Sequence, residues 1–200
     1  YLPRISERFK DDFINKGQSH ILQYNYQDRL IINMGYSYHY NSIGGAIINN
    51  TIASNSYSIR FNFESAGNIM YALSKATNIR KNNDGEYAIL GIPYAQYVKG
   101  EFDFSKNIRI DHRNSFAFHI GMGIAVPYGN AKTIPFEKQY FSGGANSVRG
   151  WTVRDLGPGS FVRDENTNLL DQSGDIKLDA SIEYRSKLFW KFQGAIFVDA

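Results

Sequence analysis

Apolar and polar residues alternate along most of this chain. The clearest example is the segment 115–126, in which every even position holds a large apolar residue and every odd position a small or polar one. A period of two places these two sets on opposite faces of a β-strand. The same pattern predicts about seven strands, at residues 20–28, 30–40, 57–65, 98–105, 115–126, 176–185 and 190–199.

The predicted connections alternate in length. Residues 105–107 and 186–189 form short connections, whereas 67–92 and 127–174 form long ones. Short turns at one end and long loops at the other are typical of outer-membrane β-barrels. The chain shows no helical periodicity, so an all-β, antiparallel fold is expected.

A soluble β-sandwich would give the same alternation, because it buries one face of each sheet against a second sheet. Three features favour a membrane barrel. Aromatic residues gather toward strand ends, as at Tyr36, Tyr38 and Tyr40, where an interfacial girdle would lie. The strands exceed the roughly five or six residues usual in globular sheets. The polar face mixes small and charged residues, as a hydrated lumen would.

Composition narrows the function classes further. No apolar run reaches the ~18 residues of a membrane helix, and alternating strands escape such a scan because their average hydrophobicity stays low. The chain has no cysteine, which excludes disulfides and thiolate chemistry. Its formal charge is only +3 and no basic block is present, so nucleic-acid binding is not expected. The first residues lack a signal-peptide pattern, as in a cytosolic protein, a mature protein or an internal piece.

The residues with catalytic potential form no site. The four histidines are scattered, and none has a second ligand at metal spacing. His119 shares the polar face with Ser115, whereas outer-membrane phospholipases use a serine and histidine on the lipid face. Glu101 and Asp103 lie on one face with ordinary cationic partners available. We therefore expect no enzyme activity, no catalytic residue, no metal and no cofactor.

The loop 127–174 contains an unusual glycine-rich stretch, FSGGANSVRGWTVRDLGPGS, at residues 141–160. The run Val148, Arg149, Gly150 and Trp151 resembles the (V/I)RG(F/Y/W) motif of the BamA/TamA superfamily of outer-membrane assembly proteins. The flanking segments 141–144 and 154–160 resemble its TamA-like branch. The next two strands match in order: SIEYR at 181–185 resembles the E-x-R strand, and FVDA at 197–200 the start of the F-x-D-x-G strand.

The resemblance implies a transmembrane barrel of sixteen strands, preceded by periplasmic POTRA modules. Residues 1–200 would form the central part of the barrel domain, with a long loop at 127–174 and the last strands missing. The implied function is assembly or translocation of proteins at the outer membrane of a Gram-negative bacterium. Implied partners are outer-membrane lipid, unfolded client proteins and periplasmic accessory or tethering subunits. A passive porin or surface antigen of the same fold is the alternative, and a secreted soluble β-sandwich is a third class.

In this superfamily the long loop folds back into the barrel and its arginine contacts the inner wall. Glu183, Phe197 and Asp199 fall on the polar, lumen-facing register of their strands. We therefore expect Arg149 to pair with Asp199, with Glu183 as second partner, since guanidinium binds carboxylate through two parallel hydrogen bonds. Trp151 would cover the pair. Glycines would let the loop backbone turn sharply; they are Gly143, Gly144, Gly157 and Gly159.

Overall fold

The computed structural model describes residues 29–42, 55–83, 85–145, 147–157, 159 and 173–200. The chain divides into two compact units. One comprises the described parts of Tyr1–Met34, Ser65–Val98 and Val126–Lys138, and the other those of Gly35–Glu64, Lys99–Ala125 and Gln139–Ala200.

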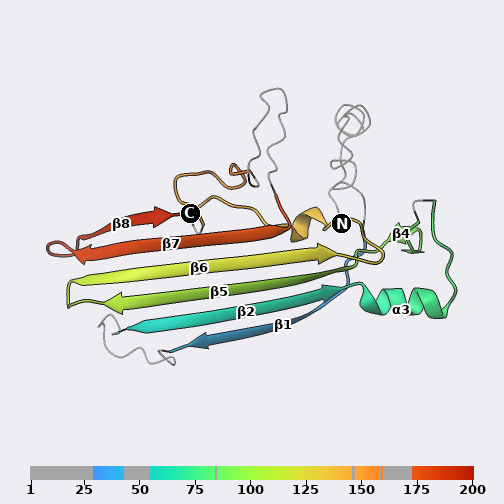
Figure 1. Cartoon of the computed structure of the whole chain (residues 1–200), viewed down its shortest axis with the longest axis horizontal. Helices are drawn as coiled ribbons and strands as arrows, with labels where there is room; N and C mark the ends of the chain where they lie inside the picture. The colour runs from blue at the N-terminus through green and yellow to red at the C-terminus, as the bar shows by residue number, and fades with distance from the viewer. Residues whose placement is uncertain (1–28, 43–54, 84, 146, 158, 160–172) are drawn as a thin grey trace, which may run out of the picture. The chain divides into compact units, whose positions relative to one another are not determined.

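A six-stranded sheet dominates the structure, in the order β1-β2-β5-β6-β7-β8. Neighbouring arrows run in opposite directions, so the sheet is an antiparallel meander (Figure 1). Within the described residues it is open, with β1 and β8 at its edges. The strands are β1 (Asn33–Asn41), β2 (Ser56–Ala66), β5 (Tyr97–Arg109), β6 (Asn114–Pro127), β7 (Ile176–Lys187) and β8 (Gln193–Asp199).

Six of the predicted strands correspond to these six elements, and the predicted strand 20–28 lies outside the described residues. The predicted turn at 105–107 is wrong, because β5 continues to Arg109. The chain instead turns around Asp111, whose carboxylate accepts hydrogen bonds from the backbone N–H groups of Arg113 and Asn114 at 2.6 and 2.8 Å. Aspartate favours such turns because its side chain satisfies nearby backbone donors. The last strand also begins later than predicted, at Gln193.

The long connection between β2 and β5 contains a helix that the sequence pattern did not predict, α3 (Asn68–Ala76). It begins directly after Gly67, whose φ is +77°. A Cβ on Gly67 would lie 2.3 Å from the carbonyl oxygen of Ala95, so the close approach of these two segments requires glycine. One short helical stretch inside a long loop gives too few turns for its period to be recognised.

The compact unit that contains α3 also holds a small two-stranded sheet, β3 (Ala88–Ile89) and β4 (Ile92–Pro93). The buried Asn130 joins its segments: the side-chain amide donates to the carbonyl oxygens of Tyr87 and Tyr94, both at 3.0 Å. Tyr94, Tyr97 and Ile134 are fully buried here. A single-turn 3₁₀ helix, η2 (Phe136–Lys138), follows.

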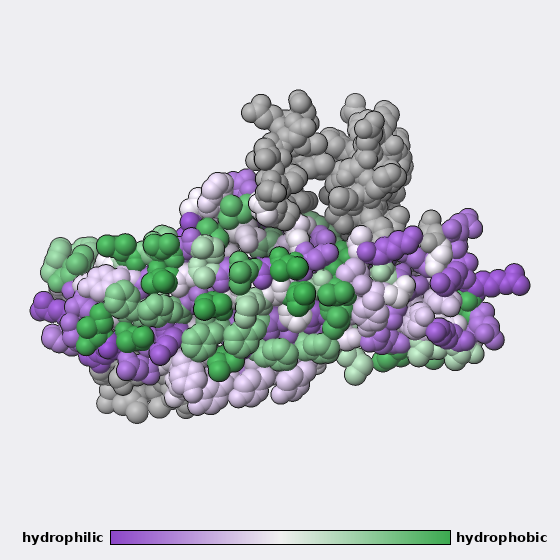
Figure 2. All heavy atoms as spheres, viewed as in Figure 1, coloured by the Kyte–Doolittle hydropathy of each residue, from purple (hydrophilic) through white to green (hydrophobic). Residues whose placement is uncertain are grey.

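The apolar face of the six-stranded sheet is uncovered. Side chains on it have exposed fractions as high as 74% at Ile196 and 72% at Ile176, and Figure 2 shows apolar residues spread over the strands. A β-sandwich would bury this face under a second large sheet, whereas the other sheet among the described residues has only the two short strands β3 and β4. The arrangement is that of part of a β-barrel wall. None of the helices in the described part of the chain is long and apolar enough to cross a membrane.

Candidate functional site

The glycine-rich stretch of the long loop folds into a small hairpin. Ser142 and Leu156 form an antiparallel bridge, and the N–H of Gly144 donates to the carbonyl oxygen of Trp151 at 2.9 Å. Gly143 has φ +98°, and a Cβ there would lie 2.2 Å from the carbonyl oxygen of Thr152. Only glycine allows the two arms of the hairpin to approach this closely. The hairpin carries Arg149 at its turn.

Arg149 is bound to two carboxylates of the sheet. Its Nε and Nη2 donate to Oδ2 and Oδ1 of Asp199, both at 2.8 Å, which is the bidentate fork geometry. Its backbone N–H also donates to Oδ2 of Asp199, at 3.0 Å. Nη1 donates to Oε2 of Glu183. One arginine therefore ties the loop to both β7 and β8 through four hydrogen bonds.

The register of β7 and β8 explains why these partners meet. Glu183 lies directly opposite Phe197, and Ser181 lies opposite Asp199. Because side chains two residues apart on a strand share a face, the two carboxylates and the Phe197 ring form one surface. The Arg149 Cζ lies 3.6 Å from the centre of the Phe197 ring, a cation–π contact. Arg185 pairs with the other oxygen of Glu183.

The side chain of Trp151 does not serve as the expected cover. It is 51% exposed, and the aromatic surface against Arg149 is provided by Phe197. Val148 precedes the arginine as a half-buried residue, and Gly150 follows it with φ +96°. Gly144 and Gly159 also have positive φ, while Gly157 follows the Ser142–Leu156 bridge.

The ion-pair cluster is partly sheltered from water. The side chain of Asp199 is 3% exposed, that of Glu183 13% and that of Arg149 27%. Hydrogen bonding to Asp199, and then to Glu183, raises the pKa of Arg149 above its ordinary value. The guanidinium therefore stays charged at every working pH, so a pH change cannot break the contact by removing the charge of Arg149.

A second contact between loop and sheet involves Tyr140, which the sequence did not indicate. The residue is 9% exposed, and its hydroxyl donates to the carbonyl oxygen of Gly100 in β5 at 3.1 Å. Lys99 places its Nζ 4.2 Å from the ring centre. A Cβ on Gly123 of β6 would lie 2.6 Å from the ring, so this glycine leaves the space that the ring fills. Backbone hydrogen bonds at 2.8 Å in both directions join Tyr140 to Gly174.

Tyr140 is expected to ionise later than an ordinary tyrosine. Burial, followed by the nearby charge of Glu101, raises the pKa of Tyr140 above its ordinary value. The folded loop accommodates the neutral hydroxyl of Tyr140. The stabilisation that the buried tyrosine gives to the fold is therefore complete below pH ~10, and it is lost as the pH rises through the raised pKa. The ultraviolet tyrosinate titration of the protein minus that of Tyr140→Phe should show a midpoint above pH ~10. A difference curve with a midpoint at or below that pH would contradict the buried position.

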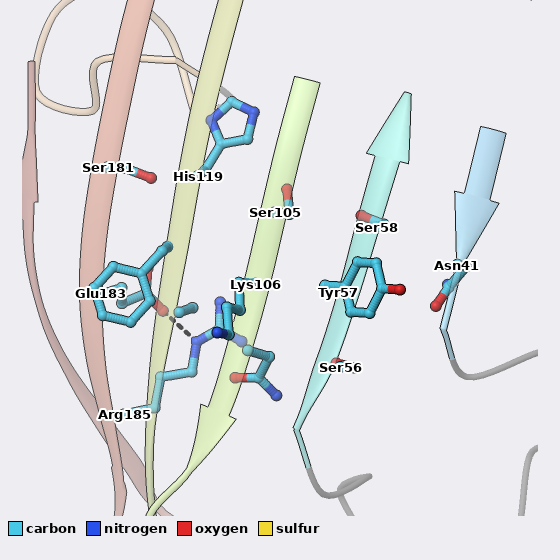
Figure 3. Close-up of a pocket in the computed structure, with 13 residues that line it drawn as sticks. Asn41, Ser56, Tyr57, Ser58, Ser105, Lys106, His119, Ser181, Glu183 and Arg185 are labelled. Carbon is cyan, nitrogen blue, oxygen red and sulfur yellow. Dashed lines mark hydrogen bonds and ion pairs between the residues drawn. The ribbon is translucent and has the colours of Figure 1, made fainter. Parts of the chain in front are cut away.

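The polar face continues as a network of ionisable side chains. His119 lies between Asp103 and Asp179, with N–O distances of 3.4 and 3.5 Å, and Lys99 pairs with Glu101 at 3.1 Å. A hollow of about 290 Å³ adjoins it, bordered by His119, Glu183 and Arg185 (Figure 3). Among the described residues, no group of three or more histidines and carboxylates could hold a metal. The arrangement offers charge and hydrogen bonding, and its chemistry is that of a polar wall.

An uncovered apolar face opposite a charged face that binds an inward-lying loop defines a β-barrel protein of the outer membrane. A model of the Omp85 superfamily domain matches residues 15–200. The chain therefore belongs to the Omp85 superfamily, and its location is the outer membrane of a Gram-negative bacterium.

One curated relative is the outer membrane protein assembly factor BamA of Neisseria meningitidis serogroup B. It is 40% identical to the chain over 62 residues. The match covers 31% of this chain and 8% of the relative, so the chain spans a small part of that protein's length.

Proposed function

We propose that the protein assembles other proteins into the outer membrane. Membership of the Omp85 superfamily and similarity to an outer membrane protein assembly factor support this function. The observation that carries it within the chain is the bidentate contact of Arg149 with Asp199, made by the loop motif of the family. The segments 141–144 and 154–160 favour a TamA-like role in inserting clients.

The proposed role of this part of the chain is mechanical. Client strands would be templated by pairing with an open strand edge of the barrel, which needs no covalent step. The barrel must then stay ordered while its hydrogen-bonded seam opens. The loop braces the wall at two points, through Tyr140 on β5 and β6 and through Arg149 on β7 and β8. Residues 1–200 would supply the central wall and the loop 127–174 of the barrel domain.

Depletion of the protein separates this function from that of a porin. We expect the amounts of folded outer-membrane proteins to fall and unfolded precursors to accumulate in the periplasm. The measurement is quantitative proteomics of the outer-membrane fraction, together with heat-modifiable gel mobility of individual clients. A complementing copy of the wild-type gene should restore client levels. Unchanged client levels, with only small-solute uptake altered, would instead identify a passive porin.

A further inference from the structure

The tight turn between β7 and β8 exposes a cluster of apolar side chains. Leu188 is 55% exposed, Phe189 70%, Trp190 85% and Phe192 55%. The ring of Phe192 lies 5.2 Å from that of Phe189 and 6.3 Å from that of Trp190. The turn itself is fixed by a hydrogen bond from the N–H of Phe192 to the carbonyl oxygen of Phe189, at 2.9 Å. A short turn in water would ordinarily hold polar residues.

Trp190 occupies a backbone position unsuited to its size. Its φ is +51°, in the left-handed region that glycine and asparagine adopt most easily. This conformation therefore costs free energy in the folded state, and the exposed ring offsets little of that cost by packing. Such local strain clusters at ligand-binding, catalytic and switch sites. We infer that the Trp190 ring contacts a partner outside this chain.

Cationic side chains flank this aromatic cluster. Lys187 and Lys191 flank the turn and are exposed, and the Nζ of Lys191 lies 5.6 Å from the ring centre of Trp190. The N–H of Lys187 donates to the carbonyl oxygen of Arg113 at 2.9 Å, which links the neighbouring turn. That turn adds the exposed Ile110 and Arg113, and one exposed carboxylate, Asp111, whose Oδ1 accepts hydrogen bonds from the backbone of the turn itself. We call this surface, residues 110, 113 and 187–192, the turn rim.

The turn rim is continuous with the apolar outer face of the sheet. Phe192 has the same strand parity as Ile196, which is 74% exposed and pairs with Tyr184 across β7 and β8. The Tyr184 ring in turn lies 5.2 Å from that of Phe116. The short turns of outer-membrane barrels face the periplasm, where the adjoining leaflet consists of phospholipid. An aromatic surface carrying lysines beside a lipid-facing wall matches a headgroup region in shape and charge.

We propose that the turn rim binds anionic phospholipid headgroups of the periplasmic leaflet. Trp190 and Phe189 enter the interface, and the cations Arg113, Lys187 and Lys191 contact the lipid phosphates. This inference depends on the outer-membrane location of the chain and is independent of the assembly function. The proposal assigns a lipid-anchoring site to the turn that joins β7 and β8, the two strands that bind Arg149.

Fluorescence quenching by brominated lipids tests the aromatic part. The full-length protein is reconstituted into phosphatidylcholine–phosphatidylglycerol vesicles with Trp190 as the sole tryptophan, every other tryptophan being replaced by phenylalanine. We expect blue-shifted emission, and at least about twofold stronger quenching by lipids brominated near the headgroup than by lipids brominated near the chain end. A matched protein with Trp151 as the sole tryptophan should be quenched little by either. Unquenched emission from Trp190 would overturn the proposal, as would efficient photocrosslinking of position 190 to protein in place of lipid.

A charge series tests the phospholipid part. Removing phosphatidylglycerol from the vesicles should reduce the quenching of Trp190, and Lys187→Gln with Lys191→Gln should abolish that difference. Heat-modifiable gel mobility confirms that each variant is folded. Quenching that is the same with and without anionic lipid in the unsubstituted protein would overturn the headgroup assignment.

Discussion

Replacing Asp199 with alanine is expected to release the loop from the sheet. The substitution removes three of the four hydrogen bonds of Arg149 and leaves a partly sheltered guanidinium with Glu183 alone. Breaking such a pair from one side should reduce the free energy that holds the loop by about 3 kcal/mol. Since roughly 1.4 kcal/mol corresponds to tenfold in an equilibrium constant, the detached population should rise about a hundredfold. The measurement is the rate of tryptic cleavage after Arg154 in the reconstituted protein.

A carboxylate that is not bound to Arg149 gives the control for this experiment. Glu137 is exposed on η2 and lies outside the Arg149 cluster, so Glu137→Ala should leave the cleavage rate unchanged. Asp199→Asn should give an intermediate rate, because the amide keeps one acceptor oxygen and loses the charge. Equal cleavage rates for Asp199→Ala and the wild type would mean that the pair does not hold the loop.

The second large effect is expected from Gly143→Ala. The methyl group would lie 2.2 Å from the Thr152 carbonyl oxygen, and the residue would have to keep φ +98°. The backbone strain costs about 1–2 kcal/mol, and relieving the overlap costs about 1–3 kcal/mol more. The hairpin that presents Arg149 should therefore open. Hydrogen exchange of the Gly144 amide, which is bonded to the Trp151 carbonyl oxygen in the wild type, should accelerate by at least about thirtyfold.

A glycine with similar φ but free space separates the overlap from the strain. Gly91 has φ +81°, and a Cβ added there would meet no atom within 4 Å, so Gly91→Ala should show only the smaller backbone cost. It lies between β3 and β4, away from the hairpin in sequence. If Gly143→Ala behaves like Gly91→Ala, the close approach of the two hairpin arms does not exist in solution.

The alternating pattern predicted the sheet because each of its strands has one apolar and one polar face. Period two is a local property, so six strands and the shared face of Glu183, Phe197 and Asp199 follow from sequence alone. The turn at Asp111 was misplaced because strand β5 continues through the polar residues Lys106 and Asn107. The helix α3 was missed because it is short and depends on Gly67 approaching the distant Ala95.

Of the two contacts between loop and sheet, the sequence predicted one and not the other. A family motif indicated Arg149, and the strand register indicated its carboxylates. No motif or strand register indicated Tyr140, because its position depends on a space that the side chains of β5 and β6 do not fill. A glycine at position 123 on the polar face was the available hint, since a missing side chain in a wall leaves room for one from elsewhere. Long-range complementarity of this kind cannot be read from local pattern.

The central claim is that Arg149 and Asp199 act as one unit that braces the barrel during client assembly. The most direct test is a double-mutant cycle on the rate at which the reconstituted full-length protein inserts a client into vesicles. Arg149→Ala and Asp199→Ala should each slow insertion at least about tenfold, and the double variant should be no slower than the worse single variant. Effects of the two substitutions that multiply, or a normal rate in either single variant, would contradict the account.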